Sequence, residues 1–213
     1  MRRPLALITG ASGKLGPTLV EAAEAAGYRV AVAVHRHAPK RAGAAGVFGA
    51  DLSKPGAALR LVRRVEQRQG PIAALIHAAG GFLTGPLLSV AQEDLDAELA
   101  VHARAFLGLS QAVVPSMRAI GQGRIVLLSM EGSKTRVFRQ VAAHAAAKAA
   151  AEVLAQSLAA ELRPEAIVVT TLALGPSPSR GALRQALRRT LRARGMSLSG
   201  RVLKVAGSGG NSM

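Results

Sequence analysis

Cysteine and tryptophan are absent from the 213 residues of the chain, which has one tyrosine and four phenylalanines. A chain without cysteine can form no disulfide bond, no thiolate metal site and no thiol-based redox centre. The absence also fits a reducing compartment. Neither a disulfide scaffold nor a cysteine-based zinc or redox protein is compatible with this composition.

Long hydrophobic runs are absent as well. The apolar run that follows Met1–Arg3 ends within a few residues at Thr9-Gly10, which is too short for the hydrophobic region of a signal peptide. No other run reaches the length of about 20 residues that a membrane-spanning helix needs. We therefore expect a cytoplasmic protein with no membrane partner.

Acidic residues are few, with 12 Asp and Glu against 28 Lys and Arg, and the formal net charge is +16. Such a charge attracts polyanions, including nucleotide cofactors, acyl carriers, nucleic acids and anionic surfaces. Because no aromatic residues alternate with the late arginines, we favour a solvated basic helix over a nucleic-acid-binding surface. These arginines are Arg180, Arg184, Arg188, Arg189, Arg192 and Arg194.

The chain is rich in the residues that build a core, with 49% hydrophobic content. This length and composition predict one sizeable core and a single domain over residues 1–213. Strand-like apolar runs alternate with helical periodicity along the whole chain, which predicts an α/β fold. We expect strands at 5–8, 28–34, 47–50, 72–76, 123–129, 167–174 and 200–205, and helices at 15–26, 55–69, 94–117, 141–162 and in the arginine-rich segment.

A glycine-rich loop, Thr9–Gly16, joins the first strand to the first helix. A turn without side chains lets the backbone approach a pyrophosphate, whose charge the N-terminus of the following helix attracts. We therefore interpret Gly10, Gly13 and Gly16 as a dinucleotide-binding loop. Glycine-rich turns at this position also occur in proteins that bind no ligand.

The second strand ends where the adenosine ribose of a dinucleotide would lie. A carboxylate there would favour the free 2′-hydroxyl of NAD, but the chain has His35-Arg36-His37. Arg36 is therefore our candidate for contact with a 2′-phosphate, which implies NADP(H) rather than NAD(H), and Lys14 could supply a second cation. The alternative for Arg36 is an ordinary exposed loop arginine.

The order and spacing of several motifs resemble the short-chain dehydrogenase/reductase family. The glycine loop, the Asp51-Leu52 pair and the Ala78-Ala79-Gly80 turn carry the first part of this resemblance. The later segments Gly123–Ser129, Ala145–Ala149 and Gly200–Val205 carry the rest. The resemblance implies a doubly wound Rossmann-type sheet of about seven parallel strands between layers of helices, with a nicotinamide cofactor across the carboxyl ends of its strands.

Together, the loop and the resemblance assign a set of residues to cofactor binding. They are Gly10, Ser12, Gly13, Lys14, Leu15, Gly16, His35, Arg36, Asp51, Leu52, Ala78, Ala79, Gly80, Lys148, Gly175 and Pro176.

The resemblance also implies a catalytic tetrad of Asn, Ser, Tyr and Lys, which this chain alters. It keeps Lys148, but His144 stands four residues earlier at the tyrosine position, and His102 follows Val101 where the family usually has Val-Asn. The only tyrosine, Tyr28, begins the second strand and cannot serve. The serine position falls on Ser129, Met130 or Glu131, depending on the landmark from which it is counted.

A histidine at position 144 could still act as a general acid, because a histidinium near neutral pH can donate a proton. His144 lies one helical turn before Lys148 and so on the same helix face, and Glu131 could pair with it in a proton relay. The alternative is that His144 only fills space beside the cofactor. His102 is more typical of a packed helix histidine, and His77 is more typical of a histidine that bonds backbone groups. No spacing of histidines and carboxylates predicts a metal site.

The family usually has a long substrate-covering segment after the sixth strand, whereas this chain has only Gly175–Ser179 before the basic helix. We expect an open pocket lined by Gly81, Phe82, Leu83 and the start of that helix. The long alanine-rich helices at 94–117 and 141–162 suggest a homodimer or homotetramer. Val113, Val114, Val153, Leu154 and Leu158 would lie either in that interface or in the core.

These observations predict an NADP(H)-dependent oxidoreductase of the short-chain dehydrogenase/reductase type that acts on a small-molecule carbonyl or alcohol. The first alternative is a catalytically inactive relative that binds NADP(H) and serves as a sensor or regulatory partner. A nucleic-acid-binding protein that uses the basic helix ranks third.

Overall fold

Seven parallel strands form one sheet in the order β3-β2-β1-β4-β5-β6-β7. The computed structural model describes residues 3–37, 41, 45–193 and 195–207, so Arg194 lies outside the described residues. The strands are β1 (Leu5–Thr9), β2 (Arg29–Val34), β3 (Val47–Gly49), β4 (Ile72–His77), β5 (Gly123–Met130), β6 (Ile167–Leu174) and β7 (Val202–Val205). This topology confirms the expected doubly wound α/β fold, whose strand order reverses direction beyond β1.

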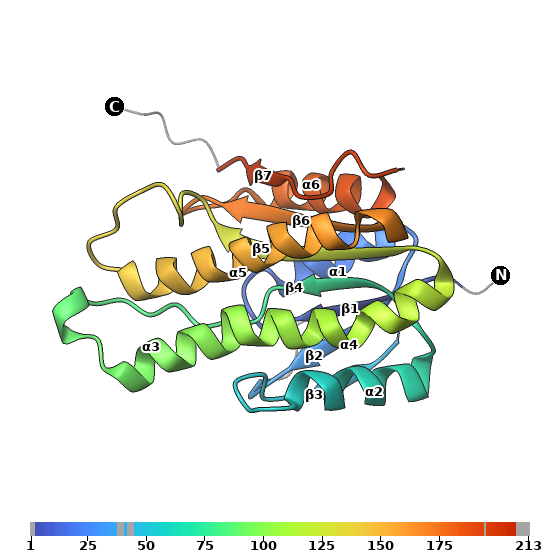
Figure 1. Cartoon of the computed structure of the whole chain (residues 1–213), viewed down its shortest axis with the longest axis horizontal. Coiled ribbons are helices and arrows are strands. Elements are labelled where there is room, and N and C mark those ends of the chain that lie inside the picture. The colour runs from blue at the N-terminus through green and yellow to red at the C-terminus, as the bar shows by residue number, and fades with distance from the viewer. Residues whose placement is uncertain (1–2, 38–40, 42–44, 194, 208–213) are drawn as a thin grey trace.

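Helices cover both faces of the sheet (Figure 1). The longer ones are α1 (Gly16–Ala25), α2 (Ala57–Gln69), α3 (Gln92–Leu99), α4 (Ala105–Ile120), α5 (Ala142–Glu161) and α6 (Arg180–Arg192). Helices α2, α4 and α5 pack on one face, and α1 and α6 pack on the other. Within the described part of the chain, no helix combines the length and apolarity needed to cross a bilayer.

Strand β1 shows why the strands are apolar at consecutive positions. Leu5 and Leu7 point into the core beneath α2, α4 and α5, whereas Ala6 and Ile8 point into the core beneath α1 and α6. A parallel sheet covered on both faces buries successive side chains alternately on its two sides. Continuous apolar runs in the sequence therefore correspond to central strands.

The helix expected at 94–117 is longer than predicted and not uniform. Helix α3 continues through a π-helical segment, η2 (Ala100–Arg104), into α4. A π-helical segment shifts the residues after it around the helix axis and is frequent at functional sites. The side chains of α4 are therefore rotated about the helix axis, relative to those of α3, compared with a regular helix of the same sequence.

The side chains proposed for a subunit interface divide between core and surface. Val113 and Val114 are buried on the sheet side of α4, while Val153 on α5 is 53% exposed. Leu154 and Leu158 are partly buried against the core. Only the exposed positions of these helices are available to a second subunit.

Helix α6 follows β6 after the short connection Gly175–Ser179, as the sequence indicates. Pro178 forms an antiparallel bridge with Gly207, and the Ser179 hydroxyl caps α6 by accepting from the backbone N–H of Ala182. Leu183 and Leu187 are buried, whereas the described arginines of α6 are exposed. This arrangement is that of a solvated basic helix held down by an apolar stripe.

Candidate active site

A crevice of about 440 Å³ opens at the carboxyl ends of β1, β2 and β4. It brings together residues from four separate segments that the sequence assigned to cofactor binding, namely Gly10, Ser12, Gly13, His35, Arg36, Asp51, Leu52, Ala78, Ala79 and Gly80. Among the described residues, its lining does not include the other members of that set, which are Lys14, Leu15, Gly16, Lys148, Gly175 and Pro176. The crevice lies where a doubly wound fold binds dinucleotides.

The glycine loop is shaped by close approaches within the protein itself. Gly10 has φ +74°, and a Cβ there would lie 2.4 Å from the carbonyl oxygen of Ala78. A Cβ on Gly16 would lie 1.9 Å from the carbonyl oxygen of Ala11. Both glycines are thus required for packing of the loop against β4 and against itself, in addition to any approach by a ligand.

Two of the basic side chains on the wall of the crevice after β2, His35 and Arg36, have different surroundings. His35 Nε2 lies 3.5 Å from a carboxylate oxygen of Asp51, whose pKa is lowered mainly by a hydrogen bond from Ser53. Arg36 is exposed and lines the crevice. Its guanidinium group is therefore placed to meet an anionic ligand from the solvent side.

His77, at the end of β4, is fully satisfied within the protein and 1% exposed. The Thr9 hydroxyl lies 2.9 Å from His77 Nδ1 and accepts from the backbone N–H groups of Ala78 and Ala79. Because that oxygen already accepts twice, its own proton is directed to Nδ1. Nε2 then donates to the carbonyl oxygen of Val101, 3.1 Å away, so the ring is neutral and ties β4 to β1 and η2.

Acidification should destabilise the protein through His77. Burial, reinforced by Lys148 and His102, lowers the pKa of His77 from 6.5 to about 3. The unfolded chain takes up a proton as the pH falls below 6.5, while the folded protein does not until about pH 3. One such histidine lowers the free energy of unfolding by roughly 2 kcal/mol between pH 6.5 and pH 5, because each pH unit contributes about 1.4 kcal/mol.

The measurement is urea unfolding at about pH 7 and pH 5 for the wild type and for His77→Asn. We expect the substitution to remove roughly 2 kcal/mol of the pH dependence. His37→Asn, on the exposed loop after β2, controls for the loss of a histidine. Equal pH dependence in wild type and His77→Asn would show that the buried ring is not held neutral.

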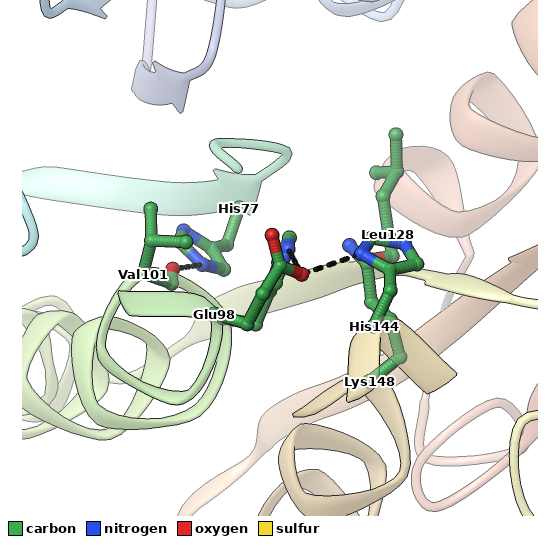
Figure 2. A network of polar contacts seen from close by, with 7 residues as sticks. His77, Glu98, Val101, Leu128, His144 and Lys148 are labelled. Carbon is green, nitrogen blue, oxygen red and sulfur yellow. Dashed lines mark hydrogen bonds and ion pairs between the residues drawn. The ribbon is translucent and has the colours of Figure 1, made fainter. Parts of the chain in front are cut away.

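Three buried polar side chains, those of Glu98, His102 and His144, meet behind Gly80. Figure 2 shows the Glu98 carboxylate directed toward His144. Glu98 Oε2 on α3 lies 2.6 Å from His144 Nδ1 on α5, and the same oxygen lies 3.3 Å from His102 Nε2 on η2. The ring centroids of His102 and His144 are 5.0 Å apart. Glu98 therefore joins the two histidines that stand at altered tetrad positions.

The protonation of this cluster follows from its surroundings. Burial alone would raise the pKa of Glu98, but its contacts with His102 and His144 outweigh burial and lower the pKa to about 2. Burial lowers the pKa of His102 to about 4 despite the nearby carboxylate. Glu98 is thus ionised at neutral pH, and His144 donates its Nδ1–H to that carboxylate.

Lys148 lies one turn after His144 on α5, and its Nζ donates to the carbonyl oxygen of Leu128, 3.1 Å away. Desolvation of its amino group lowers the pKa to about 8, although Glu98 and Glu152 oppose the shift. Ser129, at the neighbouring end of β5, is 3% exposed. Its hydroxyl has no hydrogen-bond partner among the residues that the structure describes.

The predicted pairing of Glu131 with His144 is wrong. Glu131 follows the last residue of β5, and its carboxylate lies 3.2 Å from Lys204 Nζ on β7. Glu98 takes the place beside His144, and sequence reasoning missed it. The signal was present, because Glu98 and His102 are four residues apart and such residues share a helix face.

The open pocket expected under the short connection after β6 stays a prediction, and its expected lining residues differ in their relation to the crevice. Gly81 lines the crevice, but Phe82, Leu83 and the start of α6 are not among its described lining residues. Phe82 instead places its ring edge-on to His144, with centroids 4.8 Å apart, while remaining 64% exposed. It therefore covers the histidine cluster from the solvent side.

Comparison with known proteins agrees with this geometry. The family described as short chain dehydrogenase matches residues 4–189 of the chain. A short chain dehydrogenase of Pseudocercospora fijiensis is 34% identical over 58% of this chain and 44% of its own. The 2,3-dihydroxy-2,3-dihydro-p-cumate dehydrogenase of Pseudomonas putida is 31% identical over 57% of this chain and 51% of its own. The matches thus span about half the length of these relatives.

Solved structures share the fold over nearly the whole chain. A blue fluorescent protein from a metagenomic library, solved with NADPH, superimposes with a TM-score of 0.87 at 22% identity and covers 97% of both chains. A metagenomic short-chain oxidoreductase, solved with NADP, gives 0.85 at 25% identity, covering 97% of this chain and 99% of its own. An NADH-dependent reductase solved with NAD gives 0.85 at 21% identity, covering 97% and 96%.

Proposed function

Because the chain belongs to the short-chain dehydrogenase family, we propose that it is an oxidoreductase that uses NADP(H) and acts on a small-molecule carbonyl or alcohol. The observation that carries this proposal is that the crevice lies next to the histidine cluster. The crevice behind the glycine loop extends to Gly80, and a Cβ on Gly80 would lie 1.8 Å from the ring of His102. The crevice therefore ends against the buried Glu98–His102–His144 cluster.

The crevice residues fit a dinucleotide. Gly10 and Gly13 offer a backbone without side chains next to the N-terminus of α1, which attracts phosphate. Arg36 offers a cation at the mouth, and the carboxylate of Asp51 on the same wall already faces His35. This distribution of charge favours a phosphorylated ribose and hence NADP(H). Two of the similar structures were solved with NADPH or NADP and one with NAD.

His144 is the proposed proton donor. The cofactor, when bound, supplies or accepts the hydride. The carboxylate of Glu98 accepts the Nδ1–H of His144, which holds the imidazole in one orientation. Glu98 is a positioning residue in this scheme. This ordered pair favours the oxidoreductase over an inactive nucleotide sensor, which would have no need of it.

Calorimetric titration of the purified protein with NADPH, and in parallel with NADH, tests this function first. Turnover is then measured as NADPH oxidation over a panel of aldehydes and ketones. Binding of NADPH together with turnover of any carbonyl compound supports the proposal. Binding without turnover on a broad panel would favour the sensor, and no binding by folded, cofactor-free protein would contradict both.

Arg36→Ala should weaken NADPH binding about tenfold or more and leave NADH binding within a few-fold of wild type. The expected loss corresponds to roughly one charge-assisted hydrogen bond to the 2′-phosphate, which NADH lacks. Arg41→Ala is the matched control, since Arg41 is an exposed arginine paired with Glu24 at 2.7 Å. Equal losses for NADPH and NADH would contradict contact between Arg36 and the 2′-phosphate.

A further inference from the structure

The cluster of Glu98, His102 and His144 has a second chemical property besides proton transfer. One ligand atom from each side chain lies within 4.8 Å of the other two. All three residues are buried, with exposures of 7%, 2% and 4%. Two imidazole nitrogens and one carboxylate oxygen converging at such distances are a donor set for a divalent transition-metal ion.

His102 shows that the cluster is not satisfied by its own hydrogen bonds. Its Nε2 lies 3.3 Å from Glu98 Oε2, yet neither ring nitrogen has a well-directed hydrogen bond within the described part of the chain. A buried polar group without a partner destabilises the folded protein. A metal ion bound at His102 would give a partner to one of these buried nitrogen atoms.

Two helices position these three side chains, and a glycine makes room for one of them. Glu98 and His102 are four residues apart across the start of the π-helical segment η2, so both side chains face α5. His144 lies in the first turn of α5 and faces them from the opposite side. Gly80 makes room for the His102 ring, because any Cβ there would overlap it. The three ligands are therefore fixed before any ion binds.

From this arrangement we infer that Glu98, His102 and His144 form a binding site for one Zn²⁺ ion. Zn²⁺ accepts mixed nitrogen and oxygen ligands in tetrahedral geometry, and sites with three protein ligands keep the fourth position open for water or a substrate oxygen. The carboxylate offsets part of the ion's charge. The ammonium group of Lys148 carries a positive charge that would repel the ion, but it is directed to the carbonyl oxygen of Leu128.

This inference goes beyond the proposed oxidoreductase function and does not depend on it, because it needs only the three side chains. Zn²⁺ and the Glu98–His144 hydrogen bond are alternatives, since a metal ion at His144 Nδ1 displaces the proton that Glu98 now accepts. The metal-free protein therefore keeps the proton donor, whereas the Zn²⁺-bound protein presents an electrophilic ion at the same place.

The test is a calorimetric titration of untagged, EDTA-treated protein with ZnCl₂ in the absence of nicotinamide cofactor. We expect one ion per chain and a raised melting temperature. Glu98→Gln and His102→Ala should each weaken binding more than about 100-fold, because loss of an outer-shell partner alone costs 10–100-fold. His35→Ala, which removes the exposed histidine beside Asp51, is the matched control and should bind as wild type does.

No Zn²⁺ binding by folded wild-type protein would overturn the site, as would binding that survives both cluster substitutions or that is lost in His35→Ala. If His102→Ala does not fold, Glu98→Gln decides, because it preserves the shape of the side chain. The absorption spectrum of bound Co²⁺ is a second readout, which should change in Glu98→Gln and not in His35→Ala. Zn²⁺ binding without NADPH turnover would refute only the proposed function. NADPH turnover without Zn²⁺ binding would refute only this metal site.

Discussion

Replacing His144 by alanine is expected to lower kcat for carbonyl reduction by about 10²- to 10⁴-fold, or roughly 3–5 kcal/mol in activation free energy. The physical reason is the loss of the proposed proton donor, which Glu98 orients through a 2.6 Å hydrogen bond. His144 is not among the described residues that line the cofactor crevice. NADPH affinity should therefore change by less than about threefold, which separates a defect in chemistry from a defect in binding.

The assay uses EDTA-treated protein and a substrate that the wild type reduces. His144→Tyr places the residue implied by the family resemblance at the same position and should recover part of the lost rate. Glu98→Gln should also reduce kcat, since an amide oxygen accepts a weaker hydrogen bond from His144 Nδ1–H than a carboxylate oxygen does. Unchanged kcat in His144→Ala would refute the proposed role and leave His144 as a packing residue.

Replacing Gly10 by alanine is expected to reduce the free energy of unfolding by about 4 kcal/mol. The φ of +74° costs a side-chain-bearing residue roughly 1 kcal/mol. The added Cβ would also lie 2.4–2.6 Å from backbone atoms of Ala78 and Ala79, and forcing these strands apart adds up to about 3 kcal/mol. Urea unfolding at neutral pH measures the change.

Gly121→Ala is the matched control for this experiment. Gly121 ends α4 with φ +78°, and among the described residues nothing lies within 4 Å of a Cβ built there. Its substitution should cost only about 1 kcal/mol, the backbone part of the Gly10 effect. Equal losses in the two variants would show that the glycine loop does not need its close approach to β4. NADPH binding by folded Gly10→Ala then tells whether the loop has also moved in the crevice.

Local sequence patterns were sufficient to predict the α/β class and most of the crevice, and the family resemblance added the doubly wound topology. Strand β6 was predicted with its observed bounds, and the segments around Gly10, Asp51 and Ala78 were placed at the carboxyl ends of strands. This succeeds because apolar periodicity and glycine turns act over a few residues. In a parallel sheet, the ends of the strands then converge by topology alone.

The sequence, read with its family resemblance, therefore determined a doubly wound α/β fold with a glycine loop, a basic residue after β2 and a histidine at position 144. Only the tertiary structure decided which groups meet that histidine. Glu131 lies near it in sequence yet pairs with Lys204, whereas Glu98 comes from α3, 46 residues away, and lies in hydrogen-bonding contact. Such pairing depends on how α3, η2 and α5 pack together, and helix packing is set by the whole core rather than by the spacing of any one motif.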